Sequence, residues 1–182
     1  MASNLLRSFV AALWAFTFCC FTGIAAADSM SEYQLGVGDK IAVYVFDEPD
    51  LSKEYTLSDA GTISYPFLGE IRVLGMTVGA LESRIISGLQ GPYLVDPKVN
   101  VTIKDYRQFY IHGEVEKSGG YPYQPGLTLR KAISLAGGLT ERASEKKVFV
   151  IRDTDPDKQR VSIGMDDPVR AGDTITVEQS FF

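Results

Sequence analysis

The chain has 182 residues, with 18 basic and 23 acidic side chains and a formal net charge of −5 at pH 7. This acidic balance argues against a nucleic-acid partner, because binding to a phosphate backbone requires a basic surface. His112 is the only histidine, which excludes a histidine-based metal cluster, and we expect no metal, no cofactor and no catalytic residue.

The first 27 residues have the pattern of a secretory signal. Arg7 is the only charged residue before Asp28, the middle of the segment is apolar, and the segment ends in three alanines. We predict cleavage after Ala27, which leaves 155 of the 182 residues, a net charge of −6 and no cysteine. Two alternatives stay open: a retained membrane anchor, since the uncharged stretch approaches the roughly 20 residues of a spanning helix, and a lipid on Cys20.

Short alternating segments predict strands along the rest of the chain. In residues 41–46 the odd and the even positions are both apolar, so we expect both faces of this strand to be covered. A turn cluster at residues 47–50 ends the strand. The other predicted strands, each bounded by turn-forming residues, are 62–65, 69–73, 98–104, 108–113, 147–152, 159–163 and 174–178.

Two segments change to the helical period of 3.6 residues. In "GMTVGALESRIISGLQG", apolar residues recur at three- and four-residue spacing, Thr77 is the predicted N-cap and Gly91 ends the helix. In "PGLTLRKAISLAGGL", Thr128 is the predicted N-cap and the pair Gly137-Gly138 ends the helix. Each helix lies between strands, so we expect two similar α+β units, with a boundary near residues 105–108, rather than one long parallel sheet.

A Gly-Asp pair precedes an alternating Ile-x-Val strand twice, as Gly38-Asp39 and as Gly172-Asp173. Glycine tolerates a positive φ, and an aspartate side chain bonds the backbone two residues further on. We therefore predict that each pair forms a tight turn at the entry to a strand.

Two acidic clusters are the only candidates for catalysis. A glycosidase needs two carboxylates that flank a sugar bond. Both clusters lie beside a proline, in segments typical of exposed turns, so we interpret them as solvated turns and expect no enzyme. The clusters are Asp47, Glu48 and Asp50, and Asp153, Asp155 and Asp157.

Aromatic residues are concentrated near the boundary between the two units. An aromatic face with a polar tip suits both a protein interface and a sugar ring, and such side chains equally fill a junction between two small domains. The candidates for polysaccharide or interface contact are Tyr65, Tyr106, Phe109, Tyr110, Tyr121, Tyr123, Phe181 and Phe182.

Residues 33–103, with Gly-Asp-Lys-Ile-x-Val and the Tyr65-Pro66-x-x-Gly69 motif, resemble the polysaccharide export domain of bacterial capsule and exopolysaccharide exporters. From residue 108 onward the chain resembles a soluble-ligand-binding β-grasp domain, through Gly113-x-Val115 and the motif "AGGL". The resemblance implies an α+β fold with a signal peptide at 1–27, an export domain at 28–106, and a β-grasp domain with a closing C-terminal strand at 107–182.

The resemblance also implies a role. The protein would be periplasmic, associated with the outer membrane, and would form a homo-oligomeric ring through which a polysaccharide chain passes, next to an inner-membrane polysaccharide copolymerase. The longest members of the family carry a second β-grasp domain and a C-terminal helix that builds the outer-membrane pore, whereas this sequence stops at Phe182. We therefore expect a separate outer-membrane β-barrel to supply the pore.

Two alternatives of other classes compete with this interpretation. The first is a monomeric periplasmic carbohydrate-binding module that uses the tyrosines between residues 106 and 123. The second is a small outer-membrane barrel, suggested by the terminal Phe181-Phe182, but such barrels need alternating strands of about 10 residues and the two predicted helices count against it.

Overall fold

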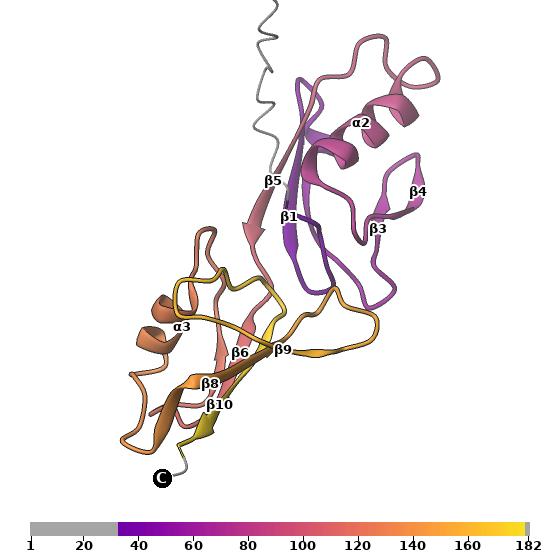
Figure 1. Ribbon diagram of the computed structural model, residues 1–182. Helices are drawn as coiled ribbons and strands as arrows, with labels where there is room; N and C mark the ends of the chain where they lie inside the picture. The colour runs from indigo at the N-terminus through magenta and orange to yellow at the C-terminus, as the bar shows by residue number, and fades with distance from the viewer. Residues whose placement is uncertain (1–32, 181–182) are drawn as a thin grey trace, which may run out of the picture. The chain divides into compact units, whose positions relative to one another are not determined.

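The computed structural model describes residues 33–180, which form three β-sheets and two α-helices (Figure 1). The predicted signal peptide, the alternatives at Cys20 and the terminal Phe181 and Phe182 lie outside the described residues. Short mixed strands accompanied by short helices confirm the predicted α+β class. Neither helix of the described chain has the length and apolar character needed to cross a membrane.

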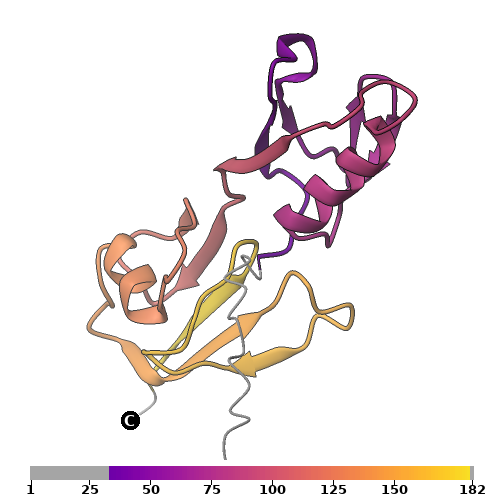
Figure 2. The same cartoon turned by 90° about the horizontal axis from the view of Figure 1, so that it is seen from above.

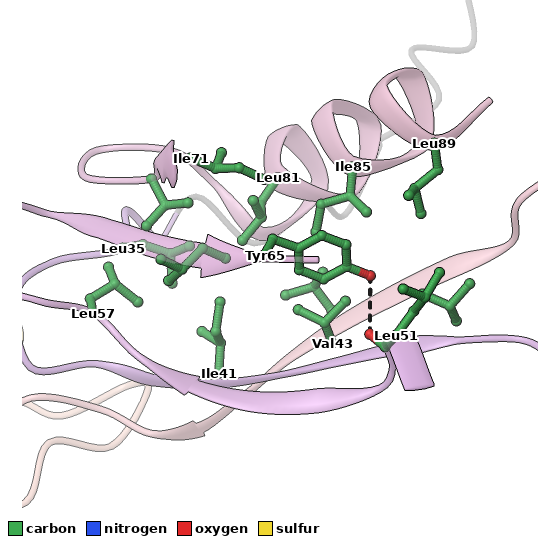
Figure 3. Close-up of a cluster of buried hydrophobic side chains, with 14 residues drawn as sticks. Leu35, Ile41, Val43, Leu51, Leu57, Tyr65, Ile71, Leu81, Ile85 and Leu89 are labelled. Atoms are coloured by element: carbon green, nitrogen blue, oxygen red, sulfur yellow. Dashed lines mark hydrogen bonds between the residues drawn. The ribbon is translucent and has the colours of Figure 1, made fainter. Parts of the chain in front are cut away.

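The first half of the described chain builds one hydrophobic core, here called the N-terminal core. An antiparallel sheet of order β2-β1-β5, a β3-β4 hairpin and the helix α2 surround it. Figure 3 shows the helix directing Leu81, Ile85 and Leu89 toward Tyr65 and the sheet. The elements are β1 (Lys40–Val45), the 3-10 turn η1 (Pro49–Leu51), β2 (Lys53–Thr56), β3 (Thr62–Tyr65), β4 (Gly69–Arg72), α2 (Val78–Leu89) and β5 (Val99–Asp105).

Strand β1 is covered on one face only, so the prediction that both faces are covered is wrong for the described chain. Ile41, Val43 and Val45 are buried in the N-terminal core. On the opposite face Tyr44 is 55% exposed and Phe46, just beyond the strand, is 58% exposed. The sheet has a single covering layer, because α2 and the β3-β4 hairpin belong to the same core, and the other face is left to solvent.

The second half builds a separate C-terminal core. A five-stranded sheet of order β7-β6-β10-β8-β9 carries the last strand in its centre, where β10 runs parallel to β6 and antiparallel to β8. Helix α3 contributes its apolar side to the same core and lies beside the sheet in both views (Figures 1 and 2). The elements are β6 (Phe109–Gly113), β7 (Gly119–Tyr121), α3 (Leu129–Leu135), β8 (Ala143–Ile151), β9 (Arg160–Ser162) and β10 (Thr174–Gln179).

Both helices start where the sequence predicts, but their first turns are stabilised differently. The Ala80 amide donates to Oγ1 of Thr77 at 3.2 Å, which confirms the predicted cap of α2. The hydroxyl of Thr128 makes no such bond. Instead, the first two amides of α3, from Leu129 and Arg130, donate to backbone carbonyls at 3.0 and 2.8 Å, so a tertiary contact replaces the side-chain cap.

The predicted end of α3 is confirmed. Gly137 and Gly138 have φ of 88° and 103°, a backbone region that favours glycine. The Gly138 amide donates to the Ile133 carbonyl at 2.9 Å, and the Gly137 amide donates to the Ser134 carbonyl at 3.1 Å. This pair of bonds satisfies carbonyls that the last helical turn leaves without donors.

Two strands, β2 and β7, are absent from the sequence prediction, and a third, β8, is longer than predicted. Strands β2 and β7 lack an alternating apolar pattern, since β2 has no fully buried residue and β7 begins with two glycines, and both lie at sheet edges where packing does not impose alternation. Strand β8 begins at Ala143 rather than near residue 147, because Ala143 pairs with Gln179 beyond a register shift in β10.

Tyr65 provides a test of the N-terminal core. Its side chain is 2% exposed, and its hydroxyl donates to the Leu51 carbonyl at 3.0 Å (Figure 3). We expect Tyr65→Phe to lower the free energy of unfolding by about 1–3 kcal/mol, because a buried acceptor loses its donor. Urea denaturation measures the change. The matched control is Tyr93→Phe at a side chain 48% exposed, where a change below about 0.5 kcal/mol is expected; equal losses in the two variants would contradict the assignment.

Candidate functional site

The first Gly-Asp pair forms a closed four-residue turn before β1. The Asp39 amide donates to the Gly36 carbonyl at 3.1 Å, and Gly38 has a φ of 89° that favours glycine. The Asp39 carboxylate accepts a 2.7 Å hydrogen bond from the Gly36 amide. The turn is therefore confirmed, but the aspartate bonds the amide three residues before it and not one two residues after it, because its side chain points back into the turn.

The second pair repeats this turn before β10. The Asp173 amide donates to the Arg170 carbonyl at 3.2 Å, Gly172 has a φ of 83°, and the Arg170 amide donates to the Asp173 carboxylate at 2.7 Å. Asp39 and Asp173 are the only buried charged residues of the described chain, 0% and 1% exposed. Burial raises the pKa of Asp173, and this effect outweighs the opposing influence of the Arg170 amide and of the Arg152 guanidinium bonded to it.

Arg107, in the segment between β5 and β6, neutralises the first buried aspartate. Its backbone amide donates to Asp39 Oδ1 at 2.8 Å, and its Nη1 donates to Asp39 Oδ2 at 3.1 Å and to the Tyr33 hydroxyl at 2.8 Å. Its Nε lies 3.4 Å from Oδ2 of Asp153. The side chain of Arg107 is only 11% exposed, so these contacts are made largely out of water.

The Arg107 guanidinium also packs against both Gly-Asp turns. A Cβ atom at Gly36 would lie 2.2 Å from Nη1 of Arg107, and a Cβ atom at Gly172 would lie 2.8 Å from its Nε. Glycine at these two positions therefore leaves the space that one guanidinium fills. Arg107 connects the entry of a strand in the N-terminal core with the entry of a strand in the C-terminal core.

A cavity of about 420 Å³, here called the tyrosine pocket, opens beside Arg107. Three half-buried tyrosines form its aromatic side: the ring centroids of Tyr33 and Tyr106 are 4.9 Å apart, and those of Tyr106 and Tyr123 are 5.4 Å apart, both edge to face. The rings of Tyr33 and Tyr123 are 6.2 Å apart and nearly parallel. Asp153, Thr154, Arg170 and Asp173 are among its other lining residues.

The hydroxyls of the pocket keep their protons around neutral pH. Burial raises the pKa of Tyr33 far above its usual range, and the hydrogen bond to Asp39 raises it further. Burial also raises the pKa of Tyr106 and of Tyr123, with smaller contributions from neighbouring groups. The pocket therefore presents neutral phenols, which donate and accept hydrogen bonds.

Two of the predicted candidates line the tyrosine pocket, and the other candidates within residues 33–180 lie outside it. Tyr106 and Tyr123 meet in the tyrosine pocket. Tyr65 and Phe109 are core residues, 2% and 0% exposed, so the interpretation that they contact a polymer or a partner is replaced by a packing role. Tyr110 on β6 is 51% exposed and lies outside the pocket lining.

Tyr121 lies apart from the pocket, although it is close to Tyr123 in sequence. Its ring stacks on Phe109 with centroids 5.9 Å apart, and its hydroxyl donates to the Lys117 carbonyl at 2.7 Å. Tyr121 and Tyr123 are two residues apart in the sequence, but only Tyr123 lines the tyrosine pocket.

Sequence reasoning missed several pocket residues. Tyr33, Arg107 and Arg170 have no motif of their own, and Arg107 stands inside the aromatic run "YRQFY", whose rings are the predicted candidates. Asp153 belongs to the predicted solvated turn, yet it pairs with Arg107 and with Lys158. The repeated Gly-Asp pair is the sequence signal that could indicate these arginines, because a buried aspartate requires a cationic partner.

Comparison with known protein families finds two regions in this chain. The family model for the polysaccharide biosynthesis/export protein matches residues 27–104, and the model for the SLBB domain matches residues 108–166.

Curated proteins resemble the same regions. The exopolysaccharide production protein ExoF of Rhizobium meliloti is 37% identical over 66% of this chain and 34% of its own length. The EPS I polysaccharide export outer membrane protein EpsA of Ralstonia nicotianae is 27% identical over 81% of this chain and 47% of its own length. The protein of the same name from Ralstonia solanacearum is 27% identical over 59% and 35%. The chain thus spans between a third and a half of the length of these relatives.

The contacts of Arg107 predict a large effect of a conservative substitution. A lysine has no planar fork and cannot bond Asp39 and Tyr33 while it also pairs with Asp153. We expect Arg107→Lys to lower the free energy of unfolding by about 2 kcal/mol in urea denaturation. The control is Arg84→Lys at an exposed arginine of α2, expected within about 0.5 kcal/mol of the wild type. A variant of Arg107 as stable as this control would refute the proposed pairing.

The raised pKa of Tyr33 predicts a loss of stability in alkali. Below about pH 10, the ordinary pKa of a phenol, Tyr33 is protonated in the folded and the unfolded chain, and its contribution is fully present. Above that value only the unfolded chain releases the proton, so the contribution falls as pH rises toward the folded pKa. We expect the free energy of unfolding to fall less between about pH 8 and about pH 11 in Tyr33→Phe than in the wild type. Parallel losses in the two proteins would contradict this assignment.

Proposed function

The chain belongs to the polysaccharide biosynthesis/export protein family, and on that premise we propose that it is a component of a bacterial machine that exports a polysaccharide. The observation that carries the proposal is the order of the two matched regions, 27–104 followed by 108–166, which together include most of the described residues. Relatives named for exopolysaccharide production and export support the same role. The role is transport, and no step of it requires catalysis by this chain.

We propose that the protein works in the periplasm next to the outer membrane, as a homo-oligomeric ring. Head-to-tail contacts that close by rotation leave a central opening, and a polymer can pass through it when each contact is weak and hydrated. The name of the Ralstonia relatives places those proteins in the outer membrane and supports this location.

Exposed apolar residues in the first half of the described chain support self-association. Phe46, 58% exposed, and Val95, 92% exposed, line a second cavity of about 270 Å³ together with Leu94 and Pro97, and charged residues complete its lining: Asp47, Glu48, Asp96 and Lys98. Exposed apolar residues that gather at one place are typical of protein interaction sites. We therefore propose this patch, Phe46 with Val95, as part of the contact between subunits.

The path of the polymer requires partners. We propose that an inner-membrane polysaccharide copolymerase delivers the polysaccharide chain to the ring and that a separate outer-membrane β-barrel releases it from the cell. The family and the relatives support a role in export, and the identity of both partners is part of the proposal.

A second candidate function is a monomeric periplasmic carbohydrate-binding module. The tyrosine pocket favours it, since its cavity of about 420 Å³ with three aromatic side chains suits one bound sugar unit. Deletion of the gene distinguishes the candidates: an export component is required for the polysaccharide to appear outside the cell, whereas a binding module is dispensable for secretion.

The proposed subunit contact predicts the effect of a charge in the patch. We expect Phe46→Glu and Val95→Glu to shift the protein from a ring to smaller species in sedimentation velocity and to reduce secreted polysaccharide, because a buried unpaired carboxylate disfavours the contact. The control is Val161→Glu on β9, an edge strand of the five-stranded sheet, at a side chain 52% exposed. Rings of unchanged size in both patch variants would exclude this patch, and a wild type that stays monomeric with its envelope partners would exclude the ring.

A further inference from the structure

The acidic groups around the tyrosine pocket already have partners. Asp39 accepts hydrogen bonds from Tyr33, from the Gly36 amide and from Arg107. Asp173 accepts from the Arg170 amide and pairs with Arg152. Asp153, which lines the pocket, pairs with Arg107 and Lys158. The buried carboxylates of Asp39 and Asp173 are therefore occupied inside the protein, while that of Asp153, 46% exposed, makes two contacts at 3.4 Å.

The donors of the pocket are not used in the same way. Arg170 lines the cavity with an exposed side chain, and no residue between 33 and 180 forms a hydrogen bond or an ion pair with its guanidinium. The hydroxyls of Tyr106 and Tyr123 likewise have no hydrogen-bond partner among these residues. Tyr33 differs, because its hydroxyl is held between Asp39 and Arg107.

One charged group of the pocket lining favours an anion. Two arginines, Arg107 and Arg170, and two carboxylates, Asp153 and Asp173, line the cavity. Arg107 pairs with Asp39 and Asp153, and Asp173 pairs with Arg152. Arg170 is therefore the lining charge left without a partner among residues 33–180, and its guanidinium favours a negatively charged ligand group.

We propose that the tyrosine pocket binds one sugar unit that carries a carboxylate, with Arg170 as the partner of the carboxylate and the rings of Tyr106 and Tyr123 against the sugar. This inference rests on the proposed function, which supplies the polysaccharide. A guanidinium presents a planar set of donors that matches a carboxylate, and a charge-assisted hydrogen bond of this kind is stronger than a neutral one. The phenol hydroxyls then donate to ring substituents of the sugar, which are acceptors.

The size and the aromatic side of the cavity restrict the ligand further. A volume of about 420 Å³ falls in the range of small-molecule sites and admits one or two sugar rings rather than a folded peptide. The apolar C–H face of a pyranose suits an aromatic face, which a small inorganic anion cannot use. A carboxylate and a pyranose face on one molecule therefore account for the arginine and the tyrosines together.

Titration calorimetry of the full chain with D-glucuronate, D-glucose and inorganic phosphate tests the proposal. Glucuronate and glucose share the ring and differ at C6, where one carries a carboxylate and the other a hydroxymethyl group. We expect glucuronate to bind at least about tenfold more tightly than glucose, because only glucuronate forms the charge-assisted bond. Phosphate, which lacks the ring, is expected to bind more weakly than glucuronate.

Two variants separate the roles of the pocket residues. Arg170→Gln is expected to weaken glucuronate binding by about tenfold and to leave glucose unchanged, while its backbone amide still closes the turn on Asp173. Tyr123→Leu is expected to weaken both sugars, because it removes an aromatic face and a hydroxyl. The control is Arg84→Gln on α2, an exposed arginine that lines no part of the pocket. Thermal denaturation confirms that each variant is folded.

Each outcome decides the inference. Binding of glucuronate that depends on Arg170 but not on Arg84 supports it. Equal binding of glucose and glucuronate, phosphate binding as tight as that of glucuronate, or no binding of glucuronate by the wild type overturns it. Secretion of polysaccharide is measured separately in cells that lack the gene: lost secretion without glucuronate binding leaves the export role intact and removes only the acidic-sugar site.

Discussion

The pairing of buried charge at Arg107 is the constraint on which the rest of the described chain depends. Asp39 is fully buried, and a carboxylate without a partner is costly at such a site. Arg107 supplies the charge through its guanidinium and a further hydrogen bond through its backbone amide. Since the guanidinium also fills the space left by Gly36 and Gly172, one side chain connects two turns that are distant in sequence.

The same pairing shapes the chemistry of the tyrosine pocket. Tyr33 is held by Asp39 and Arg107 and contributes its ring, whereas Tyr106 and Tyr123 keep their hydroxyls available. Because Asp39 and Asp173 are paired inside the protein, the Arg170 guanidinium and two phenol hydroxyls remain as donors in the pocket. This is why an acidic chain can present a local surface that suits an anionic sugar.

The two cores serve the proposed function in different ways. The N-terminal core leaves one face of its sheet uncovered, with Tyr44 and Phe46 exposed, which offers an apolar surface to the proposed contact between subunits. The C-terminal core is closed by β10 in the centre of its sheet, between β6 and β8. The second Gly-Asp turn leads directly into β10, which is hydrogen-bonded to a strand on each side. The part of the pocket wall next to Asp173 is therefore fixed by the centre of that sheet.

The sequence by itself determined the local structure: the α+β class, the cap at Thr77, the stop at Gly137-Gly138 and both Gly-Asp turns, because periodicity and φ preferences act over a few residues. It also named Tyr106 and Tyr123 among the aromatic candidates near the boundary, but their contact was decided by the tertiary structure. Only the tertiary structure decided that Tyr65 and Phe109 are core residues, that Tyr44 is exposed, and that edge strands β2 and β7 form. The partners of Arg107 are separated from it by as many as 74 residues, and no pattern along the chain encodes a contact set by packing over that distance.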